Sequence, residues 1–275
     1  MHIWGKIIDV LSYSTTTPRM LGWVHILSFI LAVGFGVFLS VRFRHSDEKT
    51  VRRLLLIASV ISIVLEIYKQ FVFSFSYDGQ AVKFDYQWYA FPFQFCSMPM
   101  YVGLLAAFIK RGRLHDALCA FLATYGFFGG LVVMVYPVQV YIGIIGINAQ
   151  TMICHGLMVA MGIYFLACGY VKLKHKTMLM ALSVFSSLVG LVMILNEAVF
   201  YSGILNGETL NMFYISRHFS PSLPVYSLIQ AIVPYPFCVI FYVFGFSAAA
   251  YIILLCAMGI NRIISNVKNR KKVMA

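Results

Sequence analysis

The sequence predicts an all-α fold: a polytopic integral membrane bundle of about seven transmembrane helices, with the N-terminus outside and the C-terminus in the cytoplasm. Three observations predict it: a composition poor in charge, seven apolar runs long enough to span a bilayer, and basic residues that alternate between successive linkers. Of the 275 residues, 61% are hydrophobic and 11% are charged, and the mean hydropathy is +0.86. A soluble domain carries about 25% charged residues on a surface that faces water, so the composition excludes a soluble class.

The apolar runs divide the chain into spans of about 20 residues, the length that a bilayer core requires. They lie at residues 21–41, 53–75, 88–109, 115–136, 151–171, 178–201 and 231–261. Each run is bounded by charged residues or by linkers rich in Pro, Gly and Asn. We therefore expect residues 1–275 to form a single membrane domain, in which the mixed, polar residues 1–19 are an interfacial arm.

The basic residues predict the orientation, because the cytoplasmic linkers of membrane proteins are enriched in Lys and Arg. Sixteen of the 21 lie in the linkers after the first, third and fifth spans and in the tail after the seventh. Four lie on the opposite side, and Lys69 lies inside the second span. This distribution puts the N-terminus outside and accounts for the net charge of +12 without a nucleic-acid partner.

Ionisable and amide side chains inside the spans are the first candidates for function, because each is costly in hydrocarbon. They are His25, Glu66, Lys69, His155, Asn196 and Glu197. At a rise of about 1.5 Å per residue, all of them fall in the outer half of the bilayer. We interpret them as one polar cavity that opens to the outer leaflet. The alternatives are histidines that reach the headgroups from helix ends and a Glu66–Lys69 pair that is self-neutralising at i, i+3.

Cys96 lies at a similar depth, in the segment WYAFPFQFCSMPM. The prolines on either side of it lack a backbone donor and loosen the helix. Because Gln94 adds an amide, we expect a polar site around the thiol. A thiol in apolar surroundings needs a base or a cation nearby in order to react, and the candidates are His155 and Lys69.

The cysteines indicate neither disulfides nor a metal site. All six lie in apolar stretches rather than in loops, which is not the pattern of a secreted disulfide framework. No Cys-x-x-Cys or His-x-x-x-His spacing supports a zinc site. We expect no metal and no cofactor.

Several short motifs carry a resemblance to a known family. The stretch FPFQFCSMPMYVG, followed further along by ICHGLMVAMGIYFL, resembles the YwaF-like family of bacterial integral membrane proteins. GWVHIL, LEIYKQ and the region from NEAVF to VPYPF fit the same pattern, whereas Gln94 stands where that family often carries a histidine. The family is related to the eukaryotic transmembrane protein 164, a phospholipid acyltransferase. The resemblance implies an acyl group carried on Cys96, with His155 as the activating base.

We therefore expect a membrane-embedded lipid acyltransferase, or an acyl hydrolase, that forms a Cys96 thioester in a bacterial plasma membrane. Lys69, Asn196 or Asn211 would donate to the oxyanion or to the lipid phosphate, and Glu66 would orient the base or the cation. The second hypothesis is a transporter or binding protein that uses the same polar residues for an ion or small solute. The expected partners are membrane phospholipids, with no nucleic acid and no known protein partner.

Overall fold

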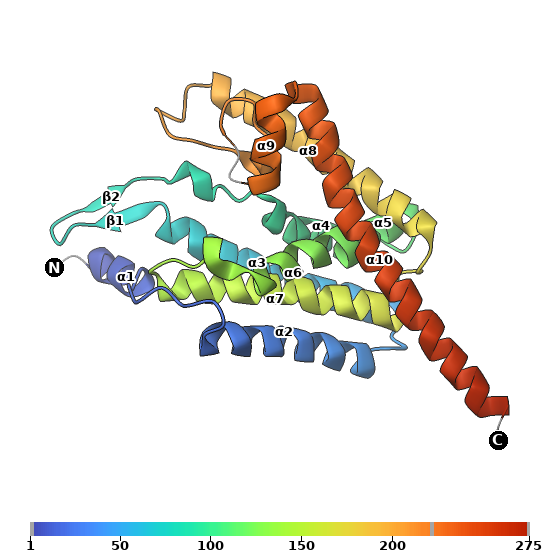
Figure 1. The fold of residues 1–275 in the computed structure, drawn as a ribbon. Helices are drawn as coiled ribbons and strands as arrows, with labels where there is room; N and C mark the ends of the chain where they lie inside the picture. Colours follow the sequence, from blue (N-terminus) through green and yellow to red (C-terminus); the bar gives the residue numbers. More distant parts are fainter. Residues whose placement is uncertain (1–2, 221–222, 274–275) are drawn as a thin grey trace.

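The computed structural model describes residues 3–220 and 223–273, and most of these residues are helical (Figure 1). The α-helices are α1 (Ile3–Leu11), α2 (Trp23–Arg42), α3 (Glu48–Val72), α4 (Met98–Phe108), α5 (Arg113–Phe121), α6 (Phe127–Val135), α7 (Ile145–Cys168), α8 (His175–Tyr201), α9 (Pro224–Ile232) and α10 (Tyr235–Val273). The shorter elements are the strands β1 (Phe75–Tyr77) and β2 (Val82–Phe84), the 3-10 turns η1 (Trp88–Ala90), η2 (Phe95–Ser97), η4 (Pro137–Gln139) and η5 (Met212–Tyr214), and the π-helical turn η3 (Leu122–Gly126).

Five helices in the described part of the chain are long and apolar enough to cross a membrane. They are Trp23–Arg42, Arg113–Val135, Ile145–Cys168, His175–Tyr201 and Tyr235–Val267. The second of these joins α5, η3 and α6 into one continuous rod. The predicted class, an all-α polytopic membrane bundle, is confirmed, and these five helices coincide with five of the seven predicted spans.

The other two predicted spans differ from each other. Residues 53–75 correspond to α3, a helix of 25 residues that starts earlier, at Glu48, where the Asp47 side chain accepts a hydrogen bond of 3.0 Å from the Thr50 N–H. Residues 88–109 are not one helix. The first part is irregular chain with two 3-10 turns, and α4 occupies only Met98–Phe108.

Two predicted boundaries are corrected by the structure. The fifth span begins at Ile145 rather than at residue 151, because the Asn148 side chain bonds both the N–H and the carbonyl of Ile142 and fixes the chain entering the helix. The last span begins at Tyr235 rather than at residue 231. Val233 is extended, as a residue before proline prefers to be, and it separates α9 from α10.

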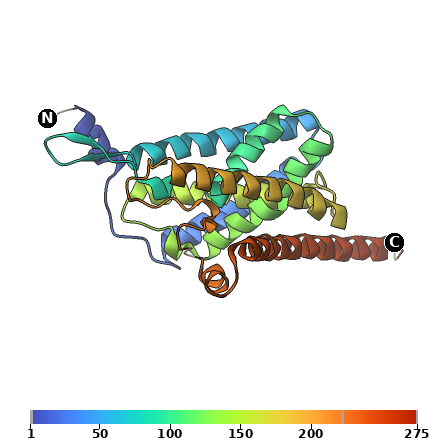
Figure 2. The ribbon, with the colours of Figure 1, turned by 90° about the horizontal axis from the view of Figure 1, so that it is seen from above.

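The helices pack in two groups (Figures 1 and 2). α7 contacts α2, α6 and α3, and α4 lies against α3. α8, α9 and α10 lie on the other side, where α8 packs on α5 and the end of α10 extends past the bundle. The largest buried cluster fills the space between the groups and contains Phe121, Tyr125, Tyr164, Phe165 and Phe185. The middle of α7 is therefore enclosed by neighbouring helices.

The hairpin β1–β2 stands with α1 at the N-terminal end of the bundle (Figure 1). Its turn is closed by Asp78, whose carboxylate accepts from the Gln80 and Ala81 N–H groups and pairs with Lys83 at 2.8 Å. The Ala81 N–H and then Lys83 hold the pKa of Asp78 well below its ordinary value. The carboxylate therefore remains charged throughout the neutral range, and the turn keeps its hydrogen bonds there.

Gly130 permits the close contact between α6 and α7. A β-carbon at this position would lie 2.7 Å from Met158 Cβ and 2.9 Å from the His155 carbonyl oxygen. We expect Gly130→Ala to lower the stability by about 1–3 kcal/mol, the usual cost of overpacking, and to displace His155. The matched control is Gly190→Ala in α8, where nothing lies within 4 Å of the added carbon. Thermal unfolding in detergent compares the two, and equal melting temperatures would contradict the packing argument.

Candidate functional site

A cavity of about 250 Å³ lies between α3, α4, α7 and η3. Most of its wall is apolar, as is usual for a small-molecule site, and a few polar groups converge on it. The polar lining side chains are Ser59, Ser62, Glu66, Lys69, Tyr89, Cys96, Ser97, Gln139, Gln150, Thr151, Cys154 and His155. The cavity thus combines two thiols, an imidazole, a carboxylate and an ammonium group within a membrane bundle.

Cys96 reaches the cavity from an irregular segment. It lies in the 3-10 turn η2, immediately before α4, and Pro99 occupies the first turn of that helix, where a missing N–H costs nothing. Irregular backbone at membrane depth is tolerated where it is enclosed by protein or lines a cavity. On the N-terminal side of Cys96, residues 88–95 form no α-helix, so the helix is interrupted there and not merely loosened by the prolines. The side chain of Cys96 is partly exposed and lines the cavity.

His155 is buried in α7, and the two nitrogens of its ring have different surroundings. Nδ1 lies 2.7 Å from the Thr151 carbonyl oxygen, which can only accept, so Nδ1 carries the proton. Nε2 has no hydrogen-bond partner among the described residues. A buried polar atom without a partner is costly. The unpaired Nε2 of a residue that lines a cavity therefore makes His155 a candidate for ligand binding or for proton transfer.

Cys96 and His155 lie on the walls of one cavity, but no hydrogen bond joins them in the described structure. The charge of Lys69 acts on both side chains and also on Cys154. Because α7 starts at Ile145, His155 lies about 15 Å along that helix at the usual rise. His155 therefore lies further from the start of its helix than in the predicted span, which begins at residue 151.

Glu66 and Lys69 form a buried ion pair of 2.8 Å, as their i, i+3 spacing indicates. Gln70 extends the pair into a network: its amide nitrogen donates to Glu66 at 2.8 Å and to the Ala90 carbonyl at 2.7 Å, and its oxygen accepts from Tyr86. The network ties α3 to the segment that leads to Cys96. Glu66 is thus satisfied on two sides, while Lys69 is held at the cavity wall.

Eight of the twelve polar residues that line this cavity were not among the residues expected from the sequence, and Ser62, Gln150 and Cys154 are three of them. Ser62 lies one turn before Glu66 on α3, and Gln150 donates from α7 to the Cys154 sulfur at 3.6 Å. The signal was available in the spacing, because residues four apart lie on one helix face. Ser62 shares a helix face with Glu66, and Gln150 shares one with Cys154. Cys154 itself is the residue before His155 in the sequence.

The other predicted site residues lie away from the cavity lining. His25 uses both ring nitrogens: Nδ1 accepts from the Leu21 N–H at 3.0 Å, and Nε2 bonds the Met134 carbonyl at 2.8 Å. Glu197 pairs with Arg217 at 2.6 Å and with His218 at 3.2 Å at the end of α8. The polar groups of His25 and Glu197 are therefore paired with residues that do not line the cavity.

Gln94, Asn196 and Asn211 hold the loop between α8 and α9. The Gln94 amide donates to the Asn211 carbonyl at 3.2 Å and accepts from the Phe213 N–H at 3.0 Å. Asn196 exchanges two hydrogen bonds with the backbone of Met212, and the Asn211 side chain accepts from the Ser216 N–H. These three amides fasten the loop over the irregular segment that carries Cys96.

We expect Asn196→Ala to destabilise the protein without changing the chemistry of the cavity. The substitution leaves the buried N–H of Met212 unpaired, at a cost of about 1–3 kcal/mol, while the Met212 carbonyl keeps its bond from the Ile215 N–H. Thermal unfolding in detergent measures the loss. Asn261→Ala, at an exposed position of α10, is the control and should leave the melting temperature unchanged. A stable Asn196→Ala protein with an altered cavity would contradict this assignment.

Comparison with known proteins identifies one relationship. The model of the TMEM164 family matches residues 17–258, which include the whole cavity. No curated protein and no solved structure matches the chain. Within the described residues, no group of three or more His, Cys, Asp and Glu side chains is placed to hold a metal ion.

Proposed function

The chain belongs to the TMEM164 family, and from this premise we propose that it is a membrane-embedded lipid acyltransferase that carries an acyl group on Cys96. The match agrees with the predicted relation to transmembrane protein 164. The YwaF-like resemblance adds the bacterial plasma membrane as the proposed location. The observation that carries the proposal is the buried, unpaired Nε2 of His155, a residue that lines the same cavity as Cys96.

The proposed reaction has two halves that use the same residues. His155 Nε2 takes the proton of the Cys96 thiol, and the thiolate attacks the ester carbonyl of a phospholipid. The carbon–oxygen bond breaks, His155 returns the proton to the departing lysolipid oxygen, and the acyl group remains as a thioester. In the second half the hydroxyl of another lysolipid gives its proton to His155 and attacks the thioester carbonyl. The carbon–sulfur bond breaks, and His155 returns the proton to the Cys96 sulfur, which frees the thiol.

Lys69 is the proposed donor to the oxyanion. Of the three donors expected from the sequence, Asn196 and Asn211 are bonded in the loop, whereas Lys69 lies in the cavity wall. A positioned cation stabilises the negative oxygen of a tetrahedral intermediate more effectively in a site without water. The Glu66 carboxylate fixes the Lys69 ammonium at 2.8 Å.

Trapping the thioester tests this function. The purified protein is incubated in mixed micelles with a phospholipid that carries an alkyne-tagged acyl chain, and the labelled protein is isolated under denaturing conditions. We expect a label that hydroxylamine removes and that is absent from Cys96→Ala. Cys154→Ser is the matched control, because Cys154 lines the same cavity and should not carry the acyl group. Equal labelling of Cys96→Ala and the unaltered chain would refute the thioester.

Two other functions predict different outcomes, one in this experiment and one in a transport assay. An acyl hydrolase would form the same thioester and release free fatty acid when no lysolipid is present. The transporter hypothesis is favoured by the ion pair in the cavity wall. A transporter of that kind would tolerate Cys96→Ala but not Glu66→Gln, and uptake by reconstituted vesicles would show this difference.

A further inference from the structure

A second and larger cavity, of about 720 Å³, lies beyond the C-terminal end of α7, between the starts of α5 and α8. This volume is within the range of about 300–1,000 Å³ that small-molecule sites occupy. Five of the side chains that line it are cationic and one is a carboxylate: Arg111, Arg113, Lys172, Lys174, Lys176 and Asp116. The excess of positive charge over a concave wall favours an anionic ligand.

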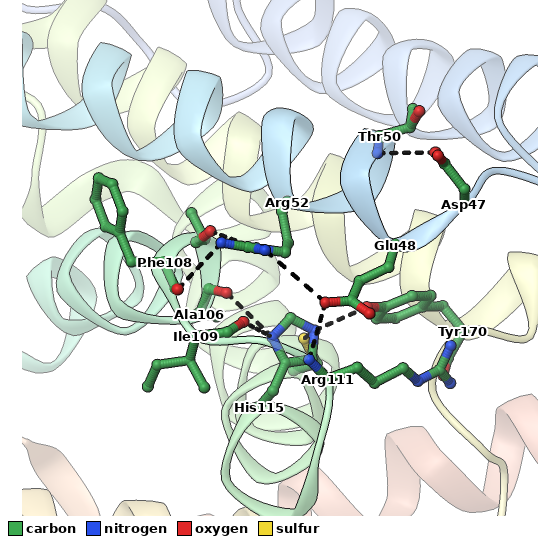
Figure 3. Close-up of polar contacts among 12 residues, drawn as sticks. Asp47, Glu48, Thr50, Arg52, Ala106, Phe108, Ile109, Arg111, His115 and Tyr170 are labelled. Carbon is green, nitrogen blue, oxygen red and sulfur yellow. Dashed lines mark hydrogen bonds and ion pairs between the residues drawn. The ribbon is translucent and has the colours of Figure 1, made fainter.

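Arg111 is held in place by several contacts, of which Figure 3 shows the bond between its backbone N–H and Glu48. Its guanidinium group lies 4.4 Å from the centre of the Tyr170 ring and donates to the Tyr170 carbonyl at 3.4 Å. Its Nε lies 3.7 Å from the Asp116 carboxylate, and its backbone N–H donates to Glu48 at 2.9 Å. A guanidinium fixed in this way loses little freedom when it binds an anion, and its planar fork suits phosphate oxygens.

Tyr170 is itself fixed by a buried histidine. The Tyr170 hydroxyl lies 2.8 Å from Nε2 of His115, a residue with no exposed surface (Figure 3). Nδ1 of His115 faces the carbonyls of Ala106 at 3.0 Å and Ile109 at 3.1 Å, so Nδ1 donates and Nε2 accepts from Tyr170. The interior of the bundle thus determines where Tyr170, and with it Arg111, lies at the cavity.

Two helix N-termini add to the positive potential. α5 begins after Gly112 and α8 after Lys174, and neither has a side-chain cap. The free N–H groups of a first helical turn carry partial positive charge and bind anions. First-turn residues of both helices, Arg113 and Lys176 among them, line the cavity. The two helix starts therefore reinforce the five cationic side chains.

We propose that this cavity is a phosphate-binding site, in which Arg111 and the lysines of the linker between α7 and α8 bind a phosphomonoester or phosphodiester group. The site is separate from the one that Cys96 and His155 line, so it does not depend on the proposed acyl transfer. The phosphate comes either from the headgroup of an anionic lipid, as in basic pockets between membrane helices, or from a soluble phosphate compound. Both sources present the same oxygens to the same cations.

The test measures binding to the purified protein in a neutral detergent, with two probes. Glycerol 3-phosphate represents the soluble source. Phosphatidic acid represents the lipid source, and diacylglycerol with the same acyl chains is its phosphate-free counterpart. The readouts are the rise in melting temperature with probe concentration and, for the lipids, native mass spectrometry. We expect phosphatidic acid, glycerol 3-phosphate or both to bind, and diacylglycerol not to bind.

The variants distinguish binding at this cavity from nonspecific attraction of phosphate by the positive charge of the protein. Arg111→Gln, and independently Lys174→Gln with Lys176→Gln, should weaken binding at least tenfold. The matched control is Lys49→Gln with Arg53→Gln, which removes two exposed charges of α3 that do not line the cavity; it should change binding less than twofold. Equal weakening in the control and in the cavity variants, or no binding of either phosphate probe by the unaltered protein, would overturn the proposal.

Discussion

Replacing His155 by asparagine is expected to slow the acylation of Cys96 by about two to four orders of magnitude, the usual contribution of a general base. The asparagine amide nitrogen stands close to where Nδ1 was, so it keeps the hydrogen bond to the Thr151 carbonyl. The substitution removes Nε2, the buried atom without a hydrogen-bond partner. The rate of thioester formation with the tagged phospholipid measures the effect, and the melting temperature should change little.

A pH series distinguishes a base from a structural residue. Without His155 the thiolate forms only by loss of a proton to the medium, so the deficit of His155→Asn should shrink as the pH rises. His25→Asn is the matched control, since His25 is an equally buried histidine with both nitrogens bonded. It should lower stability but not the acylation rate. A deficit that is the same at every pH would exclude His155 as the base.

Replacing Lys69 by methionine is expected to destabilise the protein by about 3–5 kcal/mol, because it leaves the Glu66 carboxylate buried without its counter-charge. The side chains of the pair are only 16% and 9% exposed, so water compensates little. The double variant Glu66→Gln with Lys69→Met removes both charges and should recover most of the loss. Chemical or thermal unfolding in detergent gives the three values.

The exposed pair of Lys83 and Asp78 provides the comparison. Lys83→Met breaks an ion pair of the same 2.8 Å length, but its side chains are 65% and 44% exposed. Surface ion pairs contribute little to stability, so the melting temperature should scarcely move. If the double variant at Glu66 and Lys69 were no more stable than Lys69→Met alone, the buried-charge explanation would be wrong.

Hydropathy and local spacing were sufficient for the membrane class and for part of the site. Charged and polar groups in apolar runs are rare, and this criterion singled out six residues. The structure brings Glu66, Lys69 and His155 to one cavity with Cys96, whereas His25, Asn196 and Glu197 lie away from it. The ion pair of Glu66 and Lys69 followed from their spacing on one helix. These features depend on neighbours within a few residues, which a sequence displays directly.

Other features depend on partners that are distant in the sequence. Nothing local distinguishes His25, whose ring bonds the carbonyl of Met134, from His155, whose Nε2 is unpaired. The start of α7 depends on the side chain of Asn148 folding back on Ile142, and it could not be read from hydropathy. His115 lay at the edge of a predicted span, and its role appears only when Tyr170 is brought to it.

The amide of Gln94 has a consequence for how the protein is made. Its partners, Asn211 and Phe213, follow it by more than a hundred residues, and a ribosome adds about 5–20 residues per second. For on the order of ten seconds, the segment with Cys96 is therefore synthesised and delivered to the bilayer while its partner loop does not yet exist. The irregular wall of the cavity is completed late in biogenesis, after α8 has been inserted.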